Sequence, residues 1–292
     1  MQPAVPKAKG RVVSSNASLQ IYGVELNFDT IARELATSAT STRRKGDATR
    51  SGYAIKNDLW SIASPLERSS QLDEHLRWLA NLLQPRLGFL RALVRDPEIW
   101  RVNIFSAVTI DGRSCGLKLP HESLSFLAEL GIGMELSLVF LNLSDSNEVI
   151  SDQHESEVAS RFSKDDRYKT ESRVTIAVPS RDPAVHHTLS SLGLRFAKSA
   201  ETPSDGAGFQ VPLSELEDFD SQLKWLARSL SQSDRFVQQL TRNVDITCGF
   251  ATECQWGGTW LSGEALRLPV LLHIPLGFQL RLLPVEATAF RK

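Results

Sequence analysis

The sequence predicts an α+β protein, of the mixed α/β kind, built from two tandem copies of one module with the order β-α-β-α-β-β-α-β. One observation behind this prediction is a repeated helix. Residues 72–83 and 219–230 share identical residues at several positions, all at the offset of 147 that separates Trp78 from Trp225. The other is that the segments flanking this helix recur in the same order in both halves. We therefore expect each copy to be a small mixed sheet covered by helices. The first-copy positions with an identical partner are Asp73, Leu76, Trp78, Leu79, Ala80 and Leu83.

The repeated stretch has the apolar spacing of an amphipathic helix, which we expect over about residues 71–95. Asp73 lies near its start, where a carboxylate can accept backbone N–H groups and meet the positive end of the helix dipole. Pro85 predicts a kink or a junction of two helices. We interpret Trp78 and Trp225 as core aromatics rather than as platforms for a ligand, because large aromatics at helical spacing usually pack inside. The apolar positions are Leu72, Leu76, Leu79, Leu82, Leu83, Leu87, Leu90 and Leu93.

The elements before the long helix follow from short local patterns. Residues 17–22 alternate as a strand does, and Asn27 is placed to cap a short helix. Residues 59–63 form the next strand, with Trp60 and Ile62 on one face.

After the long helix, residues 101–110 are rich in β-branched and aromatic side chains, which predicts a strand. The sequence Asp111-Gly112-Arg113 favours a hairpin turn into a strand over residues 115–119. Pro120 opens a helix that ends near Gly131, and residues 134–141 form the closing strand.

The second half repeats this order with weaker signals. Its expected elements are a strand at 173–178, a short helix at 184–192, a strand near 208–213, a long helix at 216–242 and a hairpin turn at Gly257-Gly258. We match residues 244–246 to 102–104, 261–266 to 119–124, and 276–282 to 132–138.

Composition changes mark the expected boundaries. Residues 1–16 indicate a flexible arm, residues 17–142 the first module, residues 143–171 a polar linker, and residues 172–286 a second, degenerate module.

The charge balance, the cysteines and the lack of long apolar stretches argue against several classes of protein. A net charge of −1 gives no support for nucleic-acid binding. Three cysteines cannot form a framework of disulfides, so we expect reduced thiols. No stretch has the roughly 18 apolar residues of a membrane span, and no secretory signal precedes the first module. We therefore expect a cytoplasmic protein with no membrane partner.

Several segments, taken together in order, resemble one protein family. They are Tyr22-Gly23, Arg44 to Asp47, Trp60 to Ile62, Leu72 to Leu83, Gly131-Ile132 and Glu135-Leu136. This set is similar to the bacterial "domain of unknown function 4279" family over about residues 17–142, and more weakly over 172–284. The resemblance implies an α/β module of bacterial origin with no established chemistry. By analogy with uncharacterised modules that accompany toxin systems, it also suggests an immunity protein.

The first copy carries the candidate binding residues Arg43, Arg44, Lys45, Asp47 and Trp60. Three cations beside a glycine could hold a phosphate or a carboxylate, and the strand tryptophan could line the same pocket. The alternative is a solvated loop with a local ion pair and a tryptophan in the core. The second copy has no such loop, so this candidate site exists once per chain.

No pattern in the sequence indicates catalysis or a metal. It contains no Gly-x-Ser-x-Gly elbow, P-loop, G-x-G-x-x-G or H-x-x-x-H spacing. We expect His75 to be exposed on the outer side of the long helix. We therefore predict no cofactor and no metal, and we favour a protein that is not an enzyme.

Two hypotheses remain. The preferred one is a noncatalytic protein-binding module, of an immunity or defence type, that binds and neutralises a partner such as a toxin or a defence component. The other is a module that binds a small anionic ligand, or acts on one, through the loop from Arg44 to Asp47. The sequence leaves the oligomeric state open.

Overall fold

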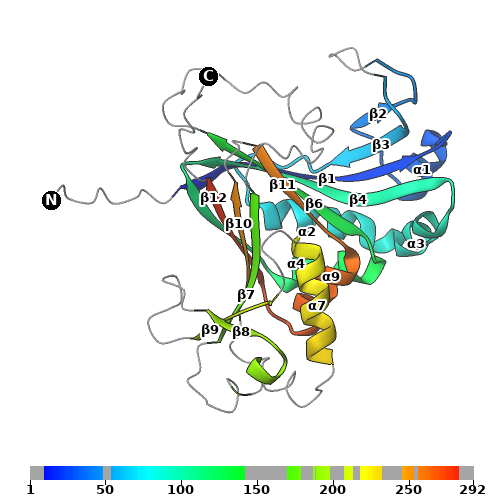
Figure 1. Cartoon of the computed structure of the whole chain (residues 1–292). Coiled ribbons are helices and arrows are strands. Elements are labelled where there is room, and N and C mark those ends of the chain that lie inside the picture. Colours follow the sequence, from blue (N-terminus) through cyan, green and yellow to red (C-terminus); the bar gives the residue numbers. More distant parts are fainter. Residues whose placement is uncertain are drawn as a thin grey trace, which may run out of the picture.

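The computed structural model describes residues 10–48, 54–141, 170–178, 187, 189–197, 207–212, 218–231, 245–252 and 256–282 (Figure 1). Most of the expected arm and linker, and much of the expected helix at 184–192, lie outside these ranges. Residues 11–16, which we assigned to the arm, form the start of the first strand, because they pair with the end of a long neighbouring strand.

Twelve described strands form two six-stranded sheets, and both sheets mix parallel with antiparallel pairs. This agrees with the predicted mixed α/β class. In order across the first sheet, the strands are β11 (Trp256–Leu261), β6 (Gly133–Leu141), β4 (Ile99–Asp111), β1 (Arg11–Gly23), β3 (Asp58–Ala63) and β2 (Ser41–Arg43). Across the second sheet they are β5 (Ser114–Leu119), β12 (Leu276–Leu282), β10 (Asp245–Thr252), β7 (Thr170–Val178), β9 (Ala207–Gln210) and β8 (Arg195–Ala197).

Helices cover one face of the first sheet (Figure 1). The described helices are α1 (Phe28–Leu35), α2 (Leu72–Leu83), α3 (Leu87–Arg95), α4 (His121–Leu130), α7 (Phe219–Ser231) and α9 (Gly263–Leu271). The 3-10 turn η1 (Gln84–Arg86) contains Pro85 and separates α2 from α3, which confirms the predicted junction. The buried apolar residues of both halves form one continuous core.

The long helix begins and packs largely as the pattern predicts. The Glu74 carboxylate accepts the Gln71 N–H at 2.9 Å, so it closes the first turn. Asp73 does not cap the helix and instead pairs with Arg77 one turn later. In α7 the same spacing recurs, with Lys224 Nζ 2.8 Å from Asp220. Trp78 is partly buried and packs against the core.

The predicted hairpin between β4 and β5 is wrong. β4 pairs antiparallel with β1 along one edge and parallel with β6 along the other, so neither edge is available to β5. Instead, β5 crosses to the second sheet and pairs with β12, while β11 of the second half crosses to the first sheet and pairs with β6. The expected turn at Gly257-Gly258 therefore lies inside β11. The two halves exchange one edge strand each.

The pairing registers of three strands in each sheet correspond at a single offset. In the first sheet Ile104, Met134 and Leu261 lie in one cross-strand row. In the second sheet the same row holds Ile246, Leu276 and Leu119, each displaced by 142 positions in the chain. The match that we predicted between residues 132–138 and 276–282 is off by two. A shift of two residues leaves every side chain on the same face, so the hydrophobic pattern cannot detect it.

Helices α4 and α9 pack against each other where the halves meet (Figure 1). At one end, a Cβ on Gly263 would lie 2.4 Å from the carbonyl carbon of Gly131, so the backbones touch there. At the other end, the rings of His121 and His273 are 5.1 Å apart between centroids. The start of each helix thus meets the end of the other, which makes the pair antiparallel.

His75 is fully buried, which contradicts the expected exposure. It stands three residues after Leu72 and one before Leu76, so it belongs to the inner stripe of α2. Neither ring nitrogen has a hydrogen-bond partner, and burial lowers the pKa of the imidazole. The equivalent residue of the repeated helix, 147 positions later, is Gln222. Its side chain accepts the Val174 N–H at 2.7 Å and donates to the Ser172 carbonyl at 3.0 Å.

Replacing His75 with glutamine should stabilise the protein by about 1 kcal/mol, because the amide can make the backbone hydrogen bonds that the buried imidazole lacks. The folded-state pKa of His75 lies below its unfolded value of about 6.5, so the wild type should lose stability as the pH falls below that value, and H75Q should lose less. Urea unfolding at several pH values measures both effects. The reciprocal change Gln222→His should destabilise, and an H75Q protein no more stable than the wild type would contradict this interpretation.

Candidate functional site

The predicted loop is held by its own chain. Arg44 Nη1 donates to Asp58 Oδ2 at 2.7 Å and to the Leu26 carbonyl at 2.6 Å, and its guanidinium lies 3.7 Å above the ring centroid of Phe28. The Asp47 carboxylate accepts the Arg44 N–H at 2.6 Å. These contacts give Arg44 and Asp47 structural roles in the turn.

Asp58, which the sequence analysis did not single out, is the centre of this arrangement. It is buried and also accepts the N–H groups of Lys45 at 2.7 Å and Leu26 at 2.9 Å. Burial acts to raise the pKa of the Asp58 carboxyl, but the hydrogen bonds from Lys45, Arg44 and Leu26 outweigh it, so the pKa lies below its usual value. A fixed carboxylate thus neutralises the cation that we expected to face a ligand.

The structure does not bring Trp60 to this loop. Its side chain is fully buried on the helix-covered face of the first sheet, beside Ile21. Arg43 lies on the opposite face, in a cross-strand row with Leu59, Tyr22 and Arg101. Lys45 is exposed at the turn. The five candidate residues therefore divide between a structural turn, the core and the outer face of the sheet.

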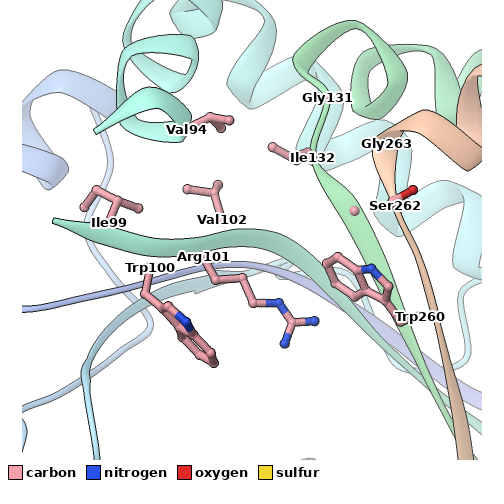
Figure 2. Close-up of a pocket in the computed structure, with 11 residues that line it drawn as sticks. Val94, Ile99, Trp100, Arg101, Val102, Gly131, Ile132, Trp260, Ser262 and Gly263 are labelled. Atoms are coloured by element: carbon pink, nitrogen blue, oxygen red, sulfur yellow. The ribbon is translucent and has the colours of Figure 1, made fainter. Parts of the chain in front are cut away.

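The outer face carries a second group of residues at a β-bulge. Tyr22 lies opposite Arg101, whereas the next residue, Gly23, lies opposite Ile99, so Trp100 is an extra residue in β4. A bulge breaks the alternation of side chains. Trp100 and Arg101 therefore project from the same side of β4, while Ile99 and Val102 project from the other (Figure 2).

We name this group the Trp100 corner, and it consists of Tyr22, Trp100, Arg101, Glu135 and Trp260. Trp100 is 65% exposed, and its ring meets the Tyr22 ring edge-on at 6.1 Å between centroids. The Arg101 guanidinium lies 4.0 Å above the Trp260 ring, and its Nη2 is 3.1 Å from Glu135 Oε2. Burial raises the pKa of the Glu135 carboxyl even though Arg101 opposes the shift. The corner is thus an ordered cluster with one widely exposed indole.

A small cavity of about 230 Å³ opens beside this corner, between the start of β4 and the end of β11 (Figure 2). The segment from Gly131 to Gly133, which leads into β6, forms part of its lining. Trp260 packs so closely on Gly133 that a Cβ there would lie within 2.4 Å of the indole ring. Val94, which is 40% exposed, adds an apolar rim. Ligand pockets for drug-sized molecules usually measure about 300–1,000 Å³, so this cavity suits one or two side chains better than a large metabolite.

Both halves of the chain build the corner. Trp100 and Arg101 belong to β4, whereas Trp260 arrives on the exchanged strand β11. At the offset of 142, the second sheet has Lys118 in place of Trp260 and Gly277 in place of Glu135. The second sheet therefore lacks the equivalents of Trp260 and Glu135. The sequence signal that could have revealed it is the run Ile99-Trp100-Arg101, where the alternation of a strand fails.

The mixed sheets and their helices define an α/β protein. Comparison of the sequence with models of known protein families gives one match. Residues 13–141 match the model of the family described as "Domain of unknown function (DUF4279)". The match extends from β1 to the end of β6 and confirms the resemblance over that part of the chain. No curated protein matches the sequence.

None of the helices in the described part of the chain is long and apolar enough to cross a membrane. Within the same ranges, no three histidine, cysteine, aspartate or glutamate side chains are grouped so that they could hold a metal ion.

Replacing Asp58 with asparagine should destabilise the protein by about 2 kcal/mol at neutral pH, because three donors would lose a charged acceptor. The folded-state pKa of Asp58 is lowered, so its contribution is present above the unfolded value of about 3.9 and is lost as the pH falls through the folded value. D58N should therefore show a flatter stability profile in acid. Denaturant unfolding measures the difference, with the exposed Asp29→Asn as the matched control. Equal stability of the two variants would overturn this account of the loop.

Proposed function

We propose that this chain is a noncatalytic protein-binding protein and that its contact surface is centred on the Trp100 corner. The observation that carries the proposal is the exposed Trp100, held by Tyr22 next to the stacked pair of Arg101 and Trp260. Tryptophan, tyrosine and arginine are the residues most enriched at the energetic centres of protein interfaces. A rigid, exposed indole loses little conformational entropy on binding, which makes it a suitable anchor.

The proposal includes two copies of one module within the chain, the second of them degenerate. The corresponding strand order of the two sheets, and the register offset that three strands of each sheet share, support this interpretation. The second sheet does not repeat Trp260 and Glu135 of the Trp100 corner. This difference also supports the interpretation, because one copy of a module can be specialised for binding while the other copy diverges.

The partner that we propose is another protein, with a toxin or a defence component as the kind suggested by analogy. The proposed location is the cytoplasm, in keeping with the two described cysteines, Cys115 and Cys248, both of which are free thiols.

The alternative of a small anionic ligand at the loop from Arg44 to Asp47 has weaker support. The Arg44 guanidinium already contacts Asp58, the Leu26 carbonyl and the Phe28 ring. A ligand there would have to compete with a buried carboxylate for the same cation.

Replacing Trp100 with alanine should weaken binding of the protein partner by about 30-fold, which corresponds to the roughly 2 kcal/mol typical of an interface anchor. The test is a pull-down from the native host with a mass-spectrometric readout, followed by titration of the captured protein. The control is Leu271→Ala, because Leu271 is also 65% exposed and lies at the end of α9. A stoichiometric partner retained by L271A and lost by W100A supports the proposal. Absence of a partner, or equal capture by both variants, would refute it.

A further inference from the structure

Neither sheet is completed by its own half of the chain. The first sheet takes β11 from the second half along the free edge of β6, and the second sheet takes β5 from the first half along the free edge of β12. The two added strands occupy equivalent positions, because Leu261 pairs with Met134 as Leu119 pairs with Leu276. The exchange is therefore reciprocal.

The exchanged strands are anchored deeply rather than attached at the surface. Leu119 and Leu261 have no exposed area, and both belong to the continuous core. Each exchanged strand leads directly into the helix that packs against its counterpart, β5 into α4 and β11 into α9. Separating the halves would expose both leucines, the contact face of both helices and the edges of β6 and β12.

In this structure, the unit that the family match covers does not pair all of its own strands. Residues 13–141 include β5, whose partner β12 lies far beyond residue 141. Within that unit the outer edge of β6 has no strand of its own half beside it, because β5 pairs with β12, and both edges of β4 are occupied by β1 and β6. An unpaired edge beside a buried apolar face is a surface that binds another strand.

We propose that the edge of β6 and the adjoining face of α4 form an interaction surface whose partner is the strand–helix unit of a second copy of the same module. In this protein, that second copy is the other half of the chain, so the two halves form an obligate, strand-exchanged pair. The pairing does not depend on the proposed role of the Trp100 corner, because it rests on the sheets alone.

The test begins with the intact protein. A protease recognition sequence is inserted within residues 142–169, between β6 and β7, and the folded chain is cut and checked on a denaturing gel. The two fragments should remain a 1:1 complex by native mass spectrometry when diluted from about 10 μM to about 10 nM, as a nanomolar or tighter complex does. The unfolding midpoint of the cut protein should rise with its concentration, and that of the uncut protein should not.

A matched pair of glycine substitutions localises the surface. Gly263→Ala places a Cβ 2.4 Å from Gly131 of the other half, whereas a Cβ on the helical Gly88 meets nothing within 4 Å. In the cut protein, G263A should weaken the association of the fragments at least about tenfold, while G88A should leave it unchanged. Fragments that separate as two folded species, a midpoint independent of concentration, or equal association in G263A and G88A would each overturn the proposal.

Discussion

A strand has only two edges, and in β4 both are used. With β1 on one side and β6 on the other, the strand that follows β4 in the chain cannot fold back on it. It pairs instead with β12 in the second sheet, and the equivalent strand of the second half, β11, occupies the remaining edge of β6. The shared core, the antiparallel contact of α4 and α9, and the composite Trp100 corner all depend on this exchange of strands.

The sequence predicted the parts of the fold that depend on local patterns. The leucine stripe of α2, the break at Pro85 and the strand character of residues 101–110 are each determined by neighbours within a few positions. The hairpin at Gly112 was wrong because turn chemistry describes a local bend and does not show whether the edge behind it is free. His75 was misplaced because a polar residue was assigned to the outer face, although its spacing from Leu72 put it on the inner one.

The candidate site was less predictable for a related reason. A cluster of cations is visible in the sequence, but the acceptor that neutralises Arg44 is Asp58, fourteen positions away, and only the folded turn brings the two together. The Trp100 corner combines residues from β1, β4, β6 and β11, and the Trp260 indole comes from the opposite half. No pattern of spacing relates residues that meet through an exchanged strand. The failed alternation at residues 99–101 was the single local clue.

The exchange also has a consequence for biosynthesis. Small domains can often fold as soon as they leave the ribosome, the N-terminal one first. Here the last strand of the first sheet is β11, so that sheet stays incomplete until residue 261 has been translated. Between the synthesis of β6 and that of β11 the edge of β6 lacks its partner strand, and a chaperone that shields such an edge would keep it from pairing with another nascent chain.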